Sequence, residues 1–312
     1  MASPPKYQIK SNLSEKQIEA DVASFFGWCT ANEITAPFRL LDVNEQLTGA
    51  DKLFDRATVI YIQFKKSSGL KSTLEIPTSN RKGRSPLEGI RDYRADEGLC
   101  SDPTLYFQLR AKAKNATDLQ HNILYAYERP PSSRGIYVAP LILDKDKYYS
   151  TLFESSTRFL LYPFFYRFNY EIHESGLISQ LGNVPFLKEH ISIPPHQKVT
   201  DHNHYYAYSE TGTDISWHSP KVIERGSMRL SEFVVKLLKT TIINPESMTS
   251  LEKAAKNAIE IGREFGFPDE LKNTNALQAL ISHGRWLLEN HDIRQFIGLA
   301  KSEDLAELRR QL

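Results

Sequence analysis

The chain has little cysteine and no long apolar run. Only two cysteines occur among 312 residues, too few for a disulfide framework or for a zinc site built on cysteine, and such low use is typical of a reducing compartment. Residues 1–6 contain no apolar core of the kind that a secretory signal requires, and no apolar run is long enough to cross a bilayer. From these absences we expect a cytoplasmic protein that does not contact membranes.

The chain also lacks an excess of charge of one sign. Its 39 Lys and Arg residues against 38 Asp and Glu residues give a formal net charge of +1. Domains that bind nucleic acid are often strongly basic overall, so any such contact here must come from a local group of basic residues. No Gly-x-x-x-x-Gly-Lys-Ser/Thr loop is present, so ATP-driven movement along a substrate would need a separate subunit.

The stretch with the clearest chemistry lies in residues 58–65. β-Branched and aromatic residues predict a strand over 58–64. The period of two of a strand gives it two faces, with Ile60, Ile62 and Phe64 on one and Tyr61, Gln63 and Lys65 on the other. We expect the first face to belong to the core and the second to carry an amide and an amine at the strand end.

An acidic residue is expected beside this strand end. Residues 38–43 form a second candidate strand, and residues 46–51 are predicted to turn the chain back, with Gly49 supplying the backbone freedom. Asp51 would then enter the sheet beside Gln63 and Lys65.

A helix is predicted from residue 15 onward. Ser14 and Gln17 fit a capping box, and an apolar stripe follows up to Gly27, a plausible terminator. Two glutamates of this helix compete for a place at the same site. Glu15 stands in the first turn, where the helix dipole favours an acid without any catalytic purpose. We favour Glu19, one turn further along at the border of the apolar face.

A carboxylate, an amide and an amine in this arrangement suit phosphodiester hydrolysis. A divalent cation neutralises phosphate charge and supplies hydroxide, and an adjacent ammonium stabilises developing charge. Gly-x-Asp followed by Gln-x-Lys, after a helix with a glutamate, resembles the PD-(D/E)XK nuclease superfamily. The similarity is to the variant in which glutamine replaces the second acid, as in Mrr-like restriction enzymes and bacterial anti-phage defence nucleases, and it covers residues 11–143.

The resemblance implies a fold, an activity and a set of site residues. The fold would be α/β, with a restriction-endonuclease-like α-β-β-β-α-β core. The activity would be that of a Mg²⁺-dependent or Mn²⁺-dependent endonuclease acting on DNA, with RNA the less favoured substrate, in anti-phage defence or restriction. Asp51, Glu19 and Gln63 would hold the metal, since hard oxygen ligands suit these cations, and Lys65 would orient the attacking water. We expect substitution of Asp51 or Lys65 by alanine to abolish cleavage.

Contacts to nucleic acid are predicted for a group of basic residues just downstream, together with one amide. These are Lys66, Lys71, Arg81, Lys82, Arg84 and Gln120. Residues 79–85 are expected to be a polar basic loop. Gln120 lies on a helix predicted over 115–127, where a polar residue of the helix surface is the other reading.

The remaining elements complete the expected order. Strands are predicted over 104–110 and 135–143, while residues 86–98 are expected to be charged and irregular. Residues 190–218 are expected to be a long irregular region, and its histidines are read as loop residues because no second cluster at zinc spacing accompanies them. Helices are predicted near 230–238, over 250–265, over 274–299 and over 302–312.

These patterns divide the chain into three parts. Residues 1–145 would be the nuclease core, and residues 146–227 a mixed, aromatic and histidine-containing region or an extension of that core. Residues 228–312 would be a helical domain, or an interface with an ATPase, a helicase, another defence subunit or a second copy. The alternative function is a catalytically inactive nuclease fold that binds nucleic acid or serves as a scaffold in a multi-protein defence complex. Binding without cleavage would distinguish it.

Overall fold

The structure is a computed structural model of the chain. It describes residues 5–29, 38–42, 55–78, 85–99, 101–114, 116–161, 185–217, 221–222, 227–244, 247–268 and 275–311. Among the described residues, no helix is both long and apolar enough to cross a membrane.

The larger of two sheets has seven strands and is mixed. Its order is β11 (Met228–Arg229), β7 (His190–Ile193), β6 (Ser133–Pro140), β3 (Arg56–Phe64), β13 (Arg294–Ala300) and β2 (Phe38–Asp42), with β12 (Thr249–Ser250) paired to the start of β3. β3 and β6 run parallel, and the other pairs are antiparallel. The predicted strand over 58–64 is therefore an inner strand of this sheet.

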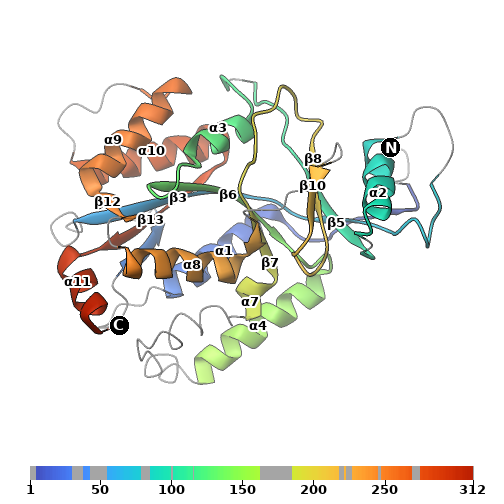
Figure 1. Ribbon diagram of the computed structural model, residues 1–312, viewed down its shortest axis with the longest axis horizontal. Coiled ribbons are helices and arrows are strands. Elements are labelled where there is room, and N and C mark those ends of the chain that lie inside the picture. Colours follow the sequence, from blue (N-terminus) through green and yellow to red (C-terminus); the bar gives the residue numbers. More distant parts are fainter. Residues whose placement is uncertain are drawn as a thin grey trace.

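The second sheet is antiparallel and has six strands. Its order is β1 (Gln8–Ile9), β4 (Ser68–Leu70), β5 (Thr104–Gln108), β8 (Tyr205–Tyr208), β9 (Ile215–Trp217) and β10 (Lys221–Val222). β4 follows β3 almost directly, so the chain passes from one sheet to the other just after Lys65. The helix α2 (Pro86–Asp96) lies beside this sheet (Figure 1).

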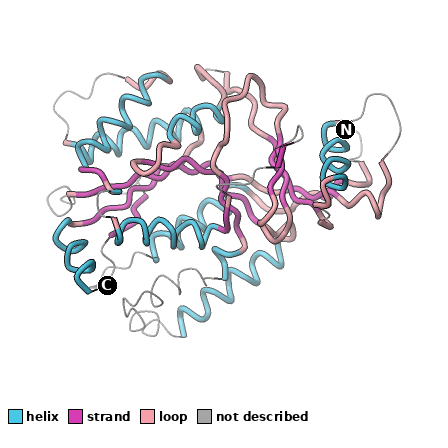
Figure 2. The backbone as a smooth tube through the Cα atoms, viewed as in Figure 1, coloured by secondary structure: helices cyan, strands magenta, loops and turns pink. Residues whose placement is uncertain are grey.

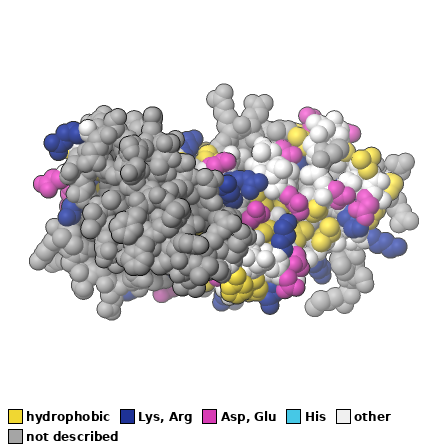
Figure 3. All heavy atoms as spheres, turned by 90° about the horizontal axis from the view of Figure 1, so that it is seen from below, with side chains coloured by type: hydrophobic (Ala, Val, Ile, Leu, Met, Phe, Trp, Pro, Cys, Tyr) yellow, Lys and Arg dark blue, Asp and Glu magenta, His cyan; other side chains and the backbone are white. Residues whose placement is uncertain are grey.

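Helices cover both faces of the seven-stranded sheet (Figures 1 and 2). One face carries α3 (Gln120–Tyr127), α9 (Leu251–Glu264) and α10 (Ala276–His291). The other carries α1 (Glu15–Cys29) and α8 (Leu230–Ile243), with α4 (Lys145–Leu161) and α7 (Pro185–Lys188) beyond them, and α11 (Ser302–Gln311) lies near the C-terminus. On the outer surface seen in Figure 3, acidic and basic side chains of the described residues are interspersed, in keeping with the small net charge.

The alternation predicted for β3 is confirmed, but both of its faces are buried. Val59 and Tyr61 pack in a core with α3, α9 and α10, whereas Ile60 and Ile62 pack in a second core against α1. Two-sided burial is expected for an inner strand with a parallel neighbour. The mixed α/β class is thus as predicted, and no particular fold within that class is identified.

The strands predicted over 38–43 and 58–64 are separated in the sheet. β13 lies between β2 and β3, so the strands predicted over 38–43 and 58–64 are not neighbours. β5, the third predicted strand, belongs to the second sheet. A sequence pattern cannot show this, because β13 reaches its place from the far end of the chain.

The helix predicted over 274–299 ends at His291, and residues 294–300 form β13 instead. Asp292 adopts the left-handed conformation, with φ of 55°, and ends α10. The residues that follow are buried on both faces of the sheet, so tertiary packing decides their state. The other C-terminal helices, α8, α9 and α11, are confirmed.

Two regions predicted to be irregular are regular. Residues 86–96 form α2, in which Ser85 and Glu88 make a reciprocal capping box and Pro86 occupies the first turn. The stretch 190–217 contains β7, β8 and β9. In both regions capping and strand alternation decide the local structure, although the composition is charged or polar.

Candidate functional site

Lys65 lies at the end of β3, where the two sheets meet. Its backbone N–H donates to the carbonyl of Val138 at 2.9 Å, which continues the pairing of β3 with β6. The residue is only 5% exposed. Burial lowers the pKa of the Lys65 ammonium, while the carboxylates of Glu15 and Asp292 act to raise it and Arg110 to lower it. The site therefore holds an amine whose positive charge is disfavoured by its surroundings.

Gln63 lies on the same face of β3 as Lys65 and is buried. Its side-chain carbonyl Oε1 has no hydrogen-bond partner among the described residues. Leaving a buried acceptor unsatisfied costs about 1–3 kcal/mol, so such a group is uncommon in folded proteins. The structure thus brings the two predicted strand residues together and leaves one oxygen atom available.

An acid that the sequence did not indicate stands at the same strand end. Arg294 is paired in register with Ile62, so Asp292, two residues earlier, lies beside the end of β3. Its carboxylate Oδ2 is 2.5 Å from Nη1 of Arg110, and both side chains are about half exposed. The pair is 182 residues apart in sequence, which is why no local motif could reveal it.

The predicted auxiliary residue Gln120 holds this acidic turn in place. Gln120 is buried, and its Nε2 donates to the carbonyls of His291 and Asp292. The amide thus ties the start of α3 to the turn between α10 and β13. In this structure Gln120 positions the turn that carries Asp292.

His121, next on α3, is fixed as a neutral imidazole. Its Nε2 donates to the carbonyl of Gln197 at 2.7 Å, so its Nδ1 must accept from the hydroxyl of Tyr137 at 2.8 Å. Burial lowers the pKa of His121 to about 4; the Gln197 carbonyl acts to raise it, and nearby histidines and Lys65 lower it. His121 therefore adds no positive charge next to Lys65 at neutral pH.

The structure separates the two candidate glutamates of α1. Oε1 of Glu15 accepts from the backbone N–H of Lys66 at 3.3 Å, which puts this carboxylate at the end of β3. Glu19 instead binds Arg294, whose Nε lies 2.7 Å from Oε1 of Glu19. Arg294 points to the α1 face of the sheet, opposite Gln63. The structure thus brings Glu15 to the site and does not bring Glu19 there.

Several predicted site residues lie outside the described residues. These are Asp51, Arg81, Lys82 and Arg84. Lys66 is exposed at the strand end, and Lys71 forms an ion pair with Glu75.

The oxygen atoms at the end of β3 can be compared with the ligands that a divalent cation requires. Among the described residues, no group of three or more His, Cys, Asp or Glu side chains could hold a metal ion. Mg²⁺, however, is often held by one or two carboxylates with water completing its shell. The unpartnered carbonyl of Gln63 and the carboxylate of Asp292, which is paired with Arg110, are oxygen donors of the kind that Mg²⁺ prefers. The histidines of residues 190–218 were predicted to be loop residues, and this is wrong for His190, which is buried in β7. That these histidines are not metal ligands stays a prediction.

The site therefore consists of a buried amine, an available amide oxygen, a half-exposed acid and a glutamate from α1. These groups come from Lys65, Gln63, Asp292 and Glu15, with α3 holding the turn that carries the acid. Comparison of the chain with protein-family models, with curated proteins and with solved structures finds no match.

Proposed function

We propose that this protein is a metal-dependent nuclease that hydrolyses phosphodiester bonds of DNA. The observation that carries the proposal is the buried Lys65 beside the unpartnered Gln63 carbonyl at one strand end, with Asp292 next to them. Burying a lysine ammonium and an unpartnered amide oxygen on one face of a strand destabilises the fold. Such unfavourable burial is typical of functional sites. Neither residue contributes to an apolar core.

Mg²⁺ or Mn²⁺ would be held by Gln63 and Asp292, with Asp51 as the further ligand predicted from the sequence. The cation would supply charge neutralisation and a hydroxide at neutral pH. Oxygen donors of this kind favour Mg²⁺ and Mn²⁺ over softer metals. Arg110, which pairs with Asp292 and is about half exposed, would contact a phosphate that approaches from solvent.

Lys65 would act on the attacking water or on the phosphate. Because burial lowers the pKa of its ammonium, the amine can release its proton more readily than a surface lysine does. A neutral amine can accept a proton from water, and the charged form can donate to a phosphate oxygen. Glu15, which acts to raise the pKa of Lys65, keeps the charged form accessible.

The biological setting proposed is anti-phage defence or restriction. This rests on the resemblance to defence nucleases and on the lack of a P-loop in the chain, which leaves any motor function to a partner. A separate ATPase or helicase would then deliver the DNA.

The experiment is a cleavage assay with purified protein. Supercoiled plasmid, linear duplex, single-stranded DNA and RNA are each incubated with Mg²⁺ or Mn²⁺, with a chelator as the control and Lys65→Met as the matched inactive variant. We expect DNA cleavage that needs the metal and is lost in the variant. Binding without cleavage in either metal would favour the inactive scaffold, and cleavage that persists equally in Lys65→Met would contradict the assignment.

A further inference from the structure

A pocket between α2 and the second sheet collects basic and hydroxyl side chains. It encloses a volume of about 10 Å³, which becomes about 240 Å³ when the open solvent at its mouth is included. The polar residues that line it are Lys71, Ser72, Thr73, Arg91, Arg94, Ser101 and Thr104. Lys71 follows β4 directly, and Arg91 and Arg94 come from α2, so two elements converge on the same space.

Arg91 is a buried cation that lacks an acid partner among the described residues. It is 4% exposed, and its guanidinium donates to backbone carbonyls only: Nε to Lys71 at 2.7 Å, and Nη2 to Ser72 at 2.9 Å and to Ile76. Its third nitrogen, Nη1, has no hydrogen-bond partner. A buried charge without a counterion is costly, and the carbonyl dipoles and the ring of Tyr7, whose centroid is 4.7 Å from the guanidinium carbon, compensate only part of that cost.

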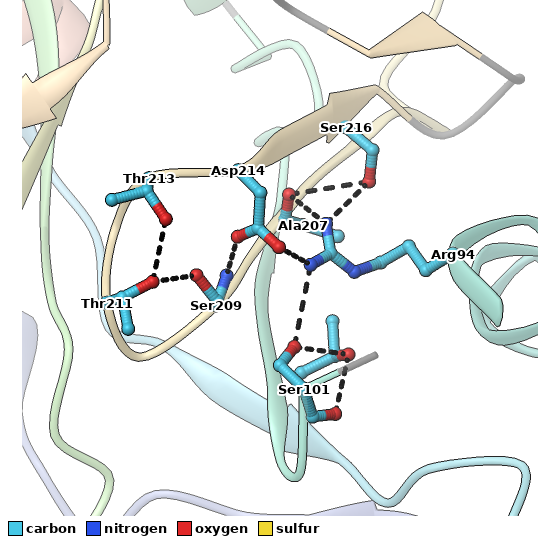
Figure 4. A network of polar contacts seen from close by, with 9 residues as sticks. Arg94, Ser101, Ala207, Ser209, Thr211, Thr213, Asp214 and Ser216 are labelled. Carbon is cyan, nitrogen blue, oxygen red and sulfur yellow. Dashed lines mark hydrogen bonds and ion pairs between the residues drawn. The ribbon is translucent and has the colours of Figure 1, made fainter. Parts of the chain in front are cut away.

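Arg94, one turn further on, forms the wall of the pocket and is already neutralised. Figure 4 shows its guanidinium among polar groups of β8 and β9, with Nη2 bonded to Oδ2 of Asp214 at 2.8 Å and Nη1 to the hydroxyl of Ser216 at 3.2 Å. Nη2 also reaches the hydroxyl of Ser101 at 3.5 Å, and this hydroxyl is 3.1 Å from that of Thr104. This network fixes two hydroxyl groups at the pocket wall.

Lys71 lies at the mouth of the pocket. It pairs with Glu75 four residues later, and the two side chains are 34% and 44% exposed. Exposed pairs of this kind contribute little to stability, so the ammonium can turn to a ligand at small cost. The pocket therefore offers one uncompensated guanidinium, one available ammonium and fixed hydroxyl groups.

We propose that this pocket binds a terminal phosphate group, as carried by a mononucleotide or by the 5′ end of a nucleic acid strand. The free Nη1 of Arg91 and the ammonium of Lys71 supply the charge-assisted hydrogen bonds that a phosphate monoester accepts, and the hydroxyl of Ser101 is a further donor. The hydroxyls of Ser72 and Thr104 already donate to Asp102 and to the carbonyl of Ser101. The bound dianion supplies the counterion that Arg91 lacks. The proposal does not rest on the nuclease site, which lies on the other sheet.

The test is calorimetric titration of the full chain with inorganic phosphate. We compare wild type with Arg91→Gln, Lys71→Gln and a matched control, Lys256→Gln. Lys256 forms the same type of exposed pair, four residues from Glu260 on α9. Loss of one charge-assisted hydrogen bond corresponds to roughly tenfold weaker binding. We expect this loss in the Arg91 and Lys71 variants and none in the control.

Further titrations identify the source of the phosphate. Adenosine monophosphate and a short oligonucleotide with a 5′-phosphate are compared, and the same oligonucleotide with a 5′-hydroxyl serves as the control. Binding of either phosphorylated ligand that Lys71→Gln weakens supports the proposal and names the source. The proposal is overturned if the wild type does not bind phosphate, or if Lys71→Gln and Lys256→Gln bind it equally. Both of these outcomes can be measured even if Arg91→Gln does not fold.

Discussion

Lys65 shows how much a single residue reveals from sequence and how much it does not. Strand alternation placed it correctly on the face of Tyr61 and Gln63. Its burial was not foreseen, because it depends on segments distant in sequence such as β6, where the carbonyl of Val138 accepts from the Lys65 N–H. Burial also changes its chemistry, since it lowers the pKa of the ammonium.

The variant Lys65→Met should separate stability from activity. Methionine keeps the length of the side chain and removes a buried charge, so we expect an unfolding temperature equal to or above that of the wild type. Metal-dependent cleavage should fall below detection. Thermal unfolding and plasmid cleavage measure the two effects, and a variant that is less stable yet fully active would contradict both roles.

The position of Asp292 beside the end of β3 could not be predicted from the sequence. The sequence predicted Asp51 as the acid beside Gln63, a residue outside the described part of the chain. Asp292 was missed because its proximity depends on the position of β13 in the sheet. Its one local signal, an aspartate that ends a helix, is common in proteins that bind nothing.

Asp292→Asn should reduce cleavage by about 100-fold or more if its carboxylate holds the cation, a loss typical of groups at metal sites. The exposed Asp146→Asn on α4 is the control and should behave like the wild type. Initial rates at several Mg²⁺ concentrations measure the effect. If Asp292→Asn matched Asp146→Asn at all of them, Asp292 would have no part in the site.

At the scale of elements, helices with caps and stripes were the most predictable. α1 begins at Glu15 as expected. The helix predicted over 115–127 begins only at Gln120, and its polar residues are buried together with Ile123 and Tyr127. β13 was not predictable, because a short apolar run after a helix fits a further helical turn as well as a strand. Residues 294–300 form a strand because they pair with β2 and β3.

The contact between α3 and β6 depends on Gly135. A Cβ atom built there would lie 2.4 Å from the carbonyl oxygen of Leu124 in α3. Gly135→Ala should therefore lower the free energy of unfolding by roughly 1–3 kcal/mol. Gly89→Ala in α2, where a Cβ meets nothing within 4 Å, should raise it by about 0.5–1 kcal/mol. Urea denaturation measures both, and equal effects would contradict the close approach.

At the scale of the whole molecule, the site is assembled from both ends of the chain. Glu15 comes from the first helix, Gln63 and Lys65 from an inner strand, and Asp292 from the turn before β13. The pair Gln63 and Lys65 could therefore be predicted from the local sequence. The residues around this pair could not, because they come together only when the whole sheet has formed.

Three buried histidines should make the stability of the molecule depend on pH. Burial lowers the pKa of His121, His190 and His283 to about 4 each, against 6.5 for the unfolded chain. Below pH 6.5 the unfolded state binds more protons, so stability should fall with pH in the window from 6.5 toward 4. Each group contributes up to about 1.4 kcal/mol per pH unit. Urea midpoints that stay constant from pH 7 to 5 would contradict the burial of these rings.

The central claim is that Gln63 offers its carbonyl to a cation at the end of β3. The most direct measurement is a calorimetric titration of Mn²⁺ into wild-type protein and into Gln63→Met, which keeps the size of the side chain and removes the oxygen. The account predicts one Mn²⁺ site in the wild type and about 10-fold to 100-fold weaker binding in the variant. Equal Mn²⁺ affinity in both proteins, or no binding in either, would contradict it.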